Sequence, residues 1–118
     1  MIAEARFLCA ECRQQAGHVQ LFGTPLSPQV RRESFTGALD AVVPPEEFSA
    51  LRSAIVQCDA RMLHSLDAEY APFFCPQCDA VYCGAHWRRW DVFDRDDPAW
   101  HDSIRGLCPQ GHERMLED

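Results

Sequence analysis

Four short pairs of cysteine and histidine residues constrain most strongly what this chain can fold into. The pairs are Cys9 with Cys12, Cys75 with Cys78, Cys83 with His86, and Cys108 with His112. Two or three intervening residues allow a tight turn to direct both side chains at one ion, but one pair does not complete a tetrahedral shell. Each pair therefore has to meet another pair that is distant in the sequence.

The number of ligands predicts the number of ions. A structural zinc site takes four nitrogen or sulfur ligands, so eight candidates fill two sites with none left over. A structural zinc ion contributes on the order of 10–16 kcal/mol of apparent binding free energy, which is comparable to the whole stability of a typical domain. We therefore expect two zinc ions to dominate the stability of one zinc-binding domain over residues 1–118.

The spacing alone leaves two ways of combining the pairs. In a compact knuckle, the second and third pairs share one ion and the pairs near the two ends of the chain form the other site. In a cross-brace, alternate pairs combine. Both arrangements use all eight ligands, but they bring different segments of the chain together.

The ligand order favours the cross-brace through a resemblance. The pattern C-x2-C-x4-C-x2-H, from Cys75 to His86, is preceded by one C-x2-C and followed by C-x3-H. It resembles the cross-braced, treble-clef-type zinc fingers related to the RING, FYVE and B-box families. The resemblance implies one site from Cys9, Cys12, Cys83 and His86, and a second site from Cys75, Cys78, Cys108 and His112.

The resemblance also implies a fold with an insertion. The ligand turns lie in residues 7–17 and 73–114, and the gap between Cys12 and Cys75 is far longer than those families show. We expect a small α+β fold, with a two-zinc core and an inserted β-hairpin and amphipathic helix over residues 18–72. The pair Cys83–His86 is expected at the start of a short helix over residues 86–93, with Trp87 and Trp90 on one helical face.

Local patterns predict the elements of the insertion. Residues 18–22 indicate a strand, residues 23–29 a loop, and residues 30–43 a hairpin turning at Thr36-Gly37. Gly17 is the expected left-handed position of the first ligand turn.

The strongest helix signal follows the predicted hairpin. Pro44-Pro45-Glu46-Glu47 suits a helix N-terminus, and apolar residues then recur at helical spacing up to Met62. The helix either runs to about Tyr70 or restarts with Asp59 as its N-cap. Cys58 lies on the apolar stripe and is expected in the core, whereas His64 lies off the stripe and is expected to be exposed.

Charge and hydropathy limit the partners and the location. Eighteen acidic residues face eleven basic residues, all of them arginine, and the net charge is −7. This balance disfavours a basic nucleic-acid or membrane-binding surface. The residues 91–102 contain five aspartates and one arginine. No apolar run is long enough for a membrane span, and the first residues lack the pattern of a signal peptide, so we expect a cytoplasmic protein with reduced cysteines.

Other readings of the same residues remain open. Cys75-Pro76-Gln77-Cys78 is also a C-P-x-C redox sequence, but no βαβ pattern surrounds it. Cys83 and His86 could form a nucleophile pair, and a catalytic zinc would need one open position, which requires that one candidate does not bind. His18 and His101 lack a paired partner at ligand spacing, so we do not expect them to be ligands.

The predicted function rests on the metal and on the motifs that the sequence lacks. It has no nucleotide loop and no catalytic constellation, so we expect no catalytic or cofactor-binding residues besides the zinc ligands. A protein-interaction adaptor domain with structural zinc fits these features. The alternatives are a RING-like E3 ligase component of a ubiquitin-like modification system and a nucleic-acid-binding zinc finger. The sequence does not identify the partner.

Overall fold

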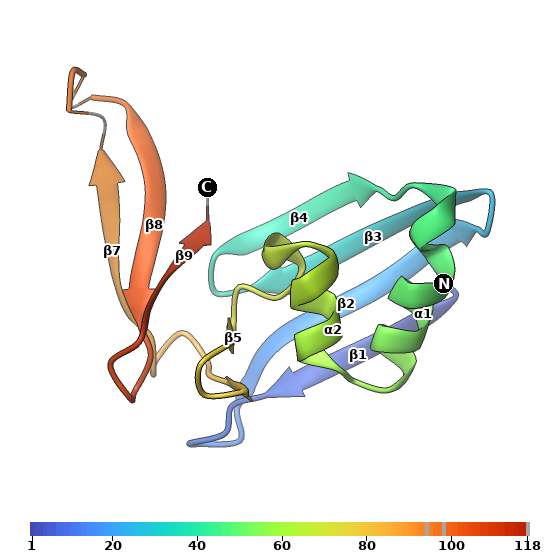
Figure 1. Ribbon diagram of the computed structural model, residues 1–118, viewed down its shortest axis with the longest axis horizontal. Helices are drawn as coiled ribbons and strands as arrows, with labels where there is room; N and C mark the ends of the chain where they lie inside the picture. The colour runs from blue at the N-terminus through green and yellow to red at the C-terminus, as the bar shows by residue number, and fades with distance from the viewer. Residues whose placement is uncertain (94, 98, 118) are drawn as a thin grey trace.

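The structure, a computed structural model, describes residues 1–93, 95–97 and 99–117. It is a small mixed domain, mostly β-strands with two α-helices. A four-stranded antiparallel sheet and its helices lie on one side of the molecule, and a three-stranded antiparallel sheet lies on the other (Figure 1). A short two-stranded ladder lies along the chain between them.

The four-stranded sheet runs in the order β1 (Ala3–Leu8), β2 (Gln15–Thr24), β3 (Ser27–Ser34) and β4 (Gly37–Val42). Alternation along the strands gives it one buried and one solvated face, because successive side chains point to opposite sides. The buried side chains include Phe7, Val19, Leu21 and Val30. The predicted hairpin over residues 30–43 is the β3–β4 pair, in which Ser34 lies opposite Gly37.

Two details of the predicted strands are wrong. Residues 23–29 are not a loop, because β2 and β3 pair as far as Thr24 with Ser27 and leave a two-residue turn. Gly17 is not left-handed but lies inside β2. A Cβ at Gly17 would lie 2.1 Å from Cε1 of Phe73, so the glycine is required by close packing.

Helices cover the buried face of this sheet (Figure 1). A short 3-10 helix, η1 (Pro45–Glu47), leads into α1 (Phe48–Val56), whose buried residues are Leu51, Ala54 and Ile55. After a break comes α2 (Ala60–Leu66), and then a second 3-10 helix, η2 (Ala68–Tyr70). The amphipathic stretch therefore forms two helices that bury one apolar face against the sheet.

The break between the helices has a local cause. The Asp59 carboxylate accepts a hydrogen bond from the Met62 backbone N–H, which is an N-cap, and Cys58 takes a left-handed φ of 53°. The restart at Asp59 is thus the observed alternative, and a single helix to Tyr70 is wrong. The break also turns Cys58 outward, so the prediction that Cys58 belongs to the core is wrong. His64 is half-buried, with its ring 5.5 Å from that of Phe74.

The C-terminal part of the chain is built from short strands. The ladder of β5 (Phe74–Cys75) and β6 (Ala80–Val81) precedes a sheet of β7 (Arg88–Phe93), β8 (His101–Leu107) and β9 (Glu113–Glu117). The helix expected over residues 86–93 is wrong, since residues 88–93 form β7 and pair with β8. Trp87 and Trp90 consequently do not share a helical face: Trp87 is buried and Trp90 is exposed.

Candidate metal centres

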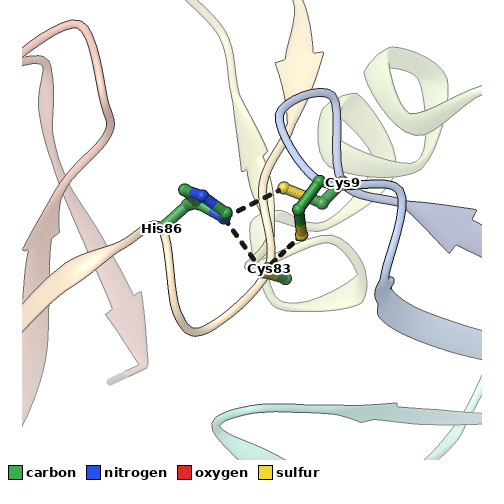
Figure 2. A group of neighbouring side chains, drawn as sticks. Cys9, Cys83 and His86 are labelled. Carbon is green, nitrogen blue, oxygen red and sulfur yellow. Dashed lines mark hydrogen bonds between the residues drawn. The ribbon is translucent and has the colours of Figure 1, made fainter.

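The first cluster joins the two halves of the chain. Cys9 and Cys12 lie in the turn between β1 and β2, and Cys83 and His86 lie in the turn between β6 and β7. The His86 Nδ1 atom is 3.5 Å from Sγ of Cys9 and 3.3 Å from Sγ of Cys83. The two sulfurs of Cys12 and Cys83 are 3.6 Å apart. Figure 2 shows Cys9, Cys83 and His86 pointing toward one another from these two turns.

The second cluster lies between the β5–β6 ladder and the β8–β9 turn. It contains Cys75, Cys78, Cys108 and His112. The His112 Nδ1 atom lies 3.7, 3.2 and 3.4 Å from the sulfurs of Cys75, Cys78 and Cys108, respectively. The sulfurs of Cys78 and Cys108 are 3.7 Å apart.

These distances fit a tetrahedral metal shell. With Zn–S of about 2.3 Å and Zn–N of about 2.0–2.1 Å, the edges of a tetrahedron are roughly 3.8 Å between sulfurs and roughly 3.6 Å between sulfur and nitrogen. The measured separations of 3.6–3.7 Å between sulfurs and 3.2–3.7 Å between sulfur and nitrogen lie close to these edges. Sulfurs of a disulfide would be only about 2.05 Å apart. Each Cys3His cluster could therefore hold one metal ion.

The pairs combine alternately along the chain. The first pair meets the third, and the second meets the fourth. The local knuckle of Cys75, Cys78, Cys83 and His86 does not form. The chain must therefore cross between the two clusters, which ties its N-terminal turn to the segment after β6.

Backbone geometry next to the pairs shapes these turns. Three positive φ angles occur beside ligands, at Arg13 (67°), Asp79 (52°) and Gly111 (86°). Arg13 and Asp79 directly follow a C-x-x-C pair, and the left-handed residue reverses the chain after the second cysteine. Left-handed conformations cost an ordinary L-residue roughly 1–2 kcal/mol, so the turns at Arg13 and Asp79 are strained unless another interaction stabilises them.

Backbone N–H groups favour thiolates in both clusters. Burial raises the pKa of Cys9, but the backbone N–H groups of Cys83, Cys12 and Glu11 outweigh it and lower the pKa to about 6. In the second cluster, burial is likewise outweighed by the backbone N–H groups of His112 and Gln110, and the pKa of Cys108 is lowered to about 7. Since metals bind the thiolate, each cluster contains a sulfur prepared for binding.

Burial and neighbouring thiols raise the pKa values of Cys75 in the second cluster and of Tyr82 beside it. Burial, together with the neighbouring Cys78 and Cys108, raises the pKa of Cys75 to about 11. Contact with Cys78, followed by burial, raises the pKa of Tyr82.

Two buried aromatic side chains, Tyr82 and Trp87, flank the turn that carries Cys83 and His86. The Trp87 ring is buried, its Nε1–H donates to the Tyr82 carbonyl at 3.0 Å, and the two rings meet edge to face with centroids 6.1 Å apart. Trp90 and Trp100 are exposed.

Close contacts fix both clusters to the main sheet. Phe73, two residues before Cys75, is stacked on Phe7 at 5.0 Å and lies over Gly17. On the other side, the Phe35 side chain of the β3–β4 turn covers Gly84, where a Cβ would lie 2.6 Å from that of Phe35. The expected insertion is therefore continuous with the metal turns, because the turn that carries Cys9 joins two strands of the main sheet.

Two arginines donate to backbone carbonyls of distant segments: Arg32 is buried and Arg114 is partly buried. Arg32 donates to Glu69 O at 2.9 Å and to Gly37 O at 2.9 Å. Arg114, two residues after His112, donates to Ala71 O at 3.1 Å and to Phe74 O. Burial lowers the pKa of Arg114 to about 10. Arg32 follows Val30 on the inward alternation of β3, and this sequence signal could have revealed its buried position.

The remaining candidates lie outside the clusters. His18 Nε2 is 2.9 Å from Glu4, and His101 Nε2 is 2.9 Å from Asp91. The Cys58 thiol points to the Arg6 carbonyl at 3.5 Å. Within the described part of the chain, no other group of three or more such side chains comes together, and all seven cysteines have free thiols.

The comparison with known families gives one result. The model of a family described as "Domain of unknown function (DUF8328)" matches residues 1–118. The chain belongs to this family. No curated protein and no solved structure gives a significant match. The family description assigns no activity, so the chemistry of the two clusters is the basis for inferring a function.

The helices bear on membrane association. Both α-helices are short, and no helix among the described residues has the length and apolar content that a bilayer crossing requires.

Proposed function

We propose that this chain is a protein-interaction (adaptor) domain whose fold is held by two structural zinc ions. The ligands would be Cys9, Cys12, Cys83 and His86 at one ion, and Cys75, Cys78, Cys108 and His112 at the other. The observation that carries the proposal is the complete Cys3His set of each cluster, with all ligand atoms within 4.8 Å of one another. Catalytic zinc keeps a position for water or substrate, whereas four protein ligands close the shell.

The donor chemistry supports zinc as the ion. Three thiolates and one imidazole suit a soft to borderline ion that favours tetrahedral geometry, and they do not suit calcium or magnesium, which take oxygen ligands. Bound zinc would link turns that are more than sixty positions apart, as in the case of Cys12 and Cys83. The protein residues would hold the ion and exclude water, and no substrate would reach it.

The same closed shells argue against the rival readings. Cys75 and Cys78 would be ligands and not a redox pair, and Cys83 and His86 would not be free to act as nucleophile and base. The net charge of −7 argues against a nucleic-acid-binding finger. Binding to another protein in a cytoplasmic setting is the role that remains.

The interleaved pairing favours one second candidate, a RING-like ligase component. In that role the domain would bind a carrier enzyme and perform no covalent step itself. The strand β7, which stands where the resemblance implied a helix, weakens this candidate. Reconstitution with ubiquitin-like carrier enzymes separates the two roles, because only a ligase component accelerates discharge of the carrier.

The adaptor role is tested by capture with the tagged full chain in its native cells. We expect a stoichiometric protein partner that is retained by the zinc-loaded chain, lost after chelation and recovered after zinc is restored. A zinc-loaded chain that captures no stoichiometric partner would contradict the adaptor role. Retention of a partner by the chelated, unfolded chain would contradict the structural role of the metal.

A further inference from the structure

The sheet of β7, β8 and β9 has an exposed aromatic surface that the metal clusters do not use. The β7–β8 hairpin extends beyond the end of β9 and away from the four-stranded sheet (Figure 1). Phe93 is 51% exposed, Trp90 is 37% exposed and Trp100 is 66% exposed. Three large aromatic side chains on one short hairpin are more than a folded domain of this size needs to leave in water.

The exposed residues adjoin a groove. It has a volume of about 360 Å³ and is lined by Trp87, Arg89, Trp90, Asp91 and Ile104. Asp91 links the groove to the outer part of the hairpin: its carboxylate is 2.9 Å from Nε2 of His101, whose ring meets that of Phe93 edge to face at 5.6 Å. We call Trp90, Asp91, Phe93, His101 and Ile104 the arm surface.

The negative charge of the β7–β8 hairpin indicates which class of partner it would attract. Residues 91–102 contain five aspartates and one arginine. Two arginines of the sheet are engaged elsewhere: Arg105 pairs with Glu113 at 3.2 Å, and Arg89 lies over the Phe35 ring at 5.0 Å. Nucleic acids and anionic membranes would be repelled, whereas a cationic protein segment would be attracted.

Arginine is the cation whose chemistry fits this surface. A guanidinium group stacks on an aromatic ring and pairs with a carboxylate at the same time, and its stem covers apolar surface. The chain itself stacks Arg61 over Phe74 at 5.6 Å and pairs the same arginine with Asp79 at 3.1 Å. The His101 ring already contacts Asp91 Oδ1 and the Phe93 ring, so a partner arginine would stack on the exposed part of the Phe93 ring and pair with the second carboxylate oxygen of Asp91.

We propose that the arm surface binds an arginine-rich segment of another protein. The inference rests on the proposed adaptor function and gives that function a surface and a class of partner. Recognition is through side chains, with arginines against the exposed rings and Asp91, and apolar residues of the segment in the groove at Ile104. No covalent step is involved.

The test uses the zinc-loaded full chain and three short fluorescently labelled peptides. Each peptide repeats one three-residue unit, which is Arg-Ser-Leu, Lys-Ser-Leu or Glu-Ser-Leu, so the peptides differ only in the charged residue. Fluorescence anisotropy is expected to show the tightest binding for the arginine peptide, weaker binding for the lysine peptide and none for the glutamate peptide. Phe93→Ser and Asp91→Asn are each expected to weaken arginine-peptide binding about tenfold.

Matched variants control for general charge and hydrophobicity. Leu26→Ser removes an exposed apolar side chain, and Glu46→Gln removes an exposed acid, both far from the arm surface in the sequence. Both are expected to bind the arginine peptide like the wild type. Zinc content and near-UV circular dichroism of each variant establish that it is folded, which is expected because the substituted side chains are exposed.

Each other outcome overturns the proposal. Equal binding of the arginine peptide by wild type and both arm variants would place the interaction elsewhere and leave the adaptor function standing. Equal binding of the arginine and glutamate peptides would refute the class of partner. Self-association that Phe93→Ser abolishes would make a second copy the occupant. No binding of any peptide, together with no captured partner, would remove the adaptor function as well.

Discussion

The substitution Gly17→Ala tests how the metal-bearing segment is attached to the sheet. The added Cβ would lie 2.1 Å from Cε1 and 2.4 Å from Cδ1 of Phe73. Carbon atoms in contact are separated by about 3.5 Å or more, so the ring has to move by roughly 1.4 Å. Phe73 is fully buried, is stacked on Phe7, and accepts a hydrogen bond from Tyr82 N at 2.9 Å.

The expected cost of Gly17→Ala follows from this confinement. Overpacking a filled core costs about 1–3 kcal/mol, and we expect the upper end, about 3 kcal/mol, because the ring cannot move without shifting the segment that leads into Cys75. This is a large fraction of the 5–15 kcal/mol that is typical of a domain. The measurement is urea unfolding of the zinc-loaded chain at fixed free zinc, followed by tryptophan fluorescence.

A double-mutant cycle isolates the contact. Phe73→Leu removes ring atoms and costs roughly 1–2 kcal/mol alone, but combined with Gly17→Ala it relieves the overlap, giving a favourable coupling of about 1–3 kcal/mol. Gly37→Ala is the control, since a Cβ there meets no atom within 4 Å although φ is 108°. It should cost only backbone strain and show no coupling to Phe73. A Gly17→Ala protein within about 0.5 kcal/mol of wild type would refute the packing argument.

Three further substitutions test one ligand turn, the partly buried Arg114 and the pH response. Arg13→Gly removes a left-handed L-residue (φ 67°) and should stabilise the zinc-loaded chain by roughly 0.5–1 kcal/mol in thermal unfolding; an unchanged or lower midpoint would contradict the strain at this turn. Arg114→Met leaves the carbonyls of Ala71 and Phe74 without their donor and should cost roughly 2–4 kcal/mol, whereas a cost below about 0.5 kcal/mol would mean that water replaces the guanidinium. Burial, followed by the positive charges of Arg114 and Arg61, lowers the pKa of His64 in the folded state below its ordinary 6.5. Neutral His64 therefore contributes stability above pH 6.5, and this contribution is lost as the pH falls through the folded-state pKa of His64. The urea midpoint should therefore fall less for His64→Gln than for wild type between pH of about 7.5 and 5.5, and parallel curves would be the contrary result.

The gathering of the eight paired cysteine and histidine side chains was predictable from the sequence because tetrahedral coordination requires four ligands and short pairs bring only two. This requirement holds whatever lies between the pairs. The pairing itself depended on the order of the pairs and on a resemblance, since spacing alone left the local knuckle open. In the structure, all eight predicted side chains gather in the two alternate groups.

The local structure around the third pair was not predictable from the same resemblance. Residues 86–93 have helical spacing of Trp87 and Trp90, but pairing with β8 decides the conformation, and the partners lie between 8 (Phe93 with His101) and 19 (Arg88 with Leu107) positions further along the chain. The prediction that Cys58 lies in the core was wrong for a related reason. It assumed that the helix continues through Cys58, whereas the N-cap at Asp59 starts a new helix and leaves Cys58 outside the core. Gly17 was assigned to a backbone role although a distant ring, Phe73, determines it.

The two-ion, interleaved arrangement is tested most directly by native mass spectrometry of paired cysteine variants purified without added metal. The wild-type chain should carry two zinc ions. Cys9→Ser with Cys83→Ser damages one cluster and should leave one ion, whereas Cys75→Ser with Cys83→Ser damages both and should leave none. One ion retained by the Cys75/Cys83 variant and none by the Cys9/Cys83 variant would mean local pairing, and a wild-type chain without metal would contradict the account of the fold.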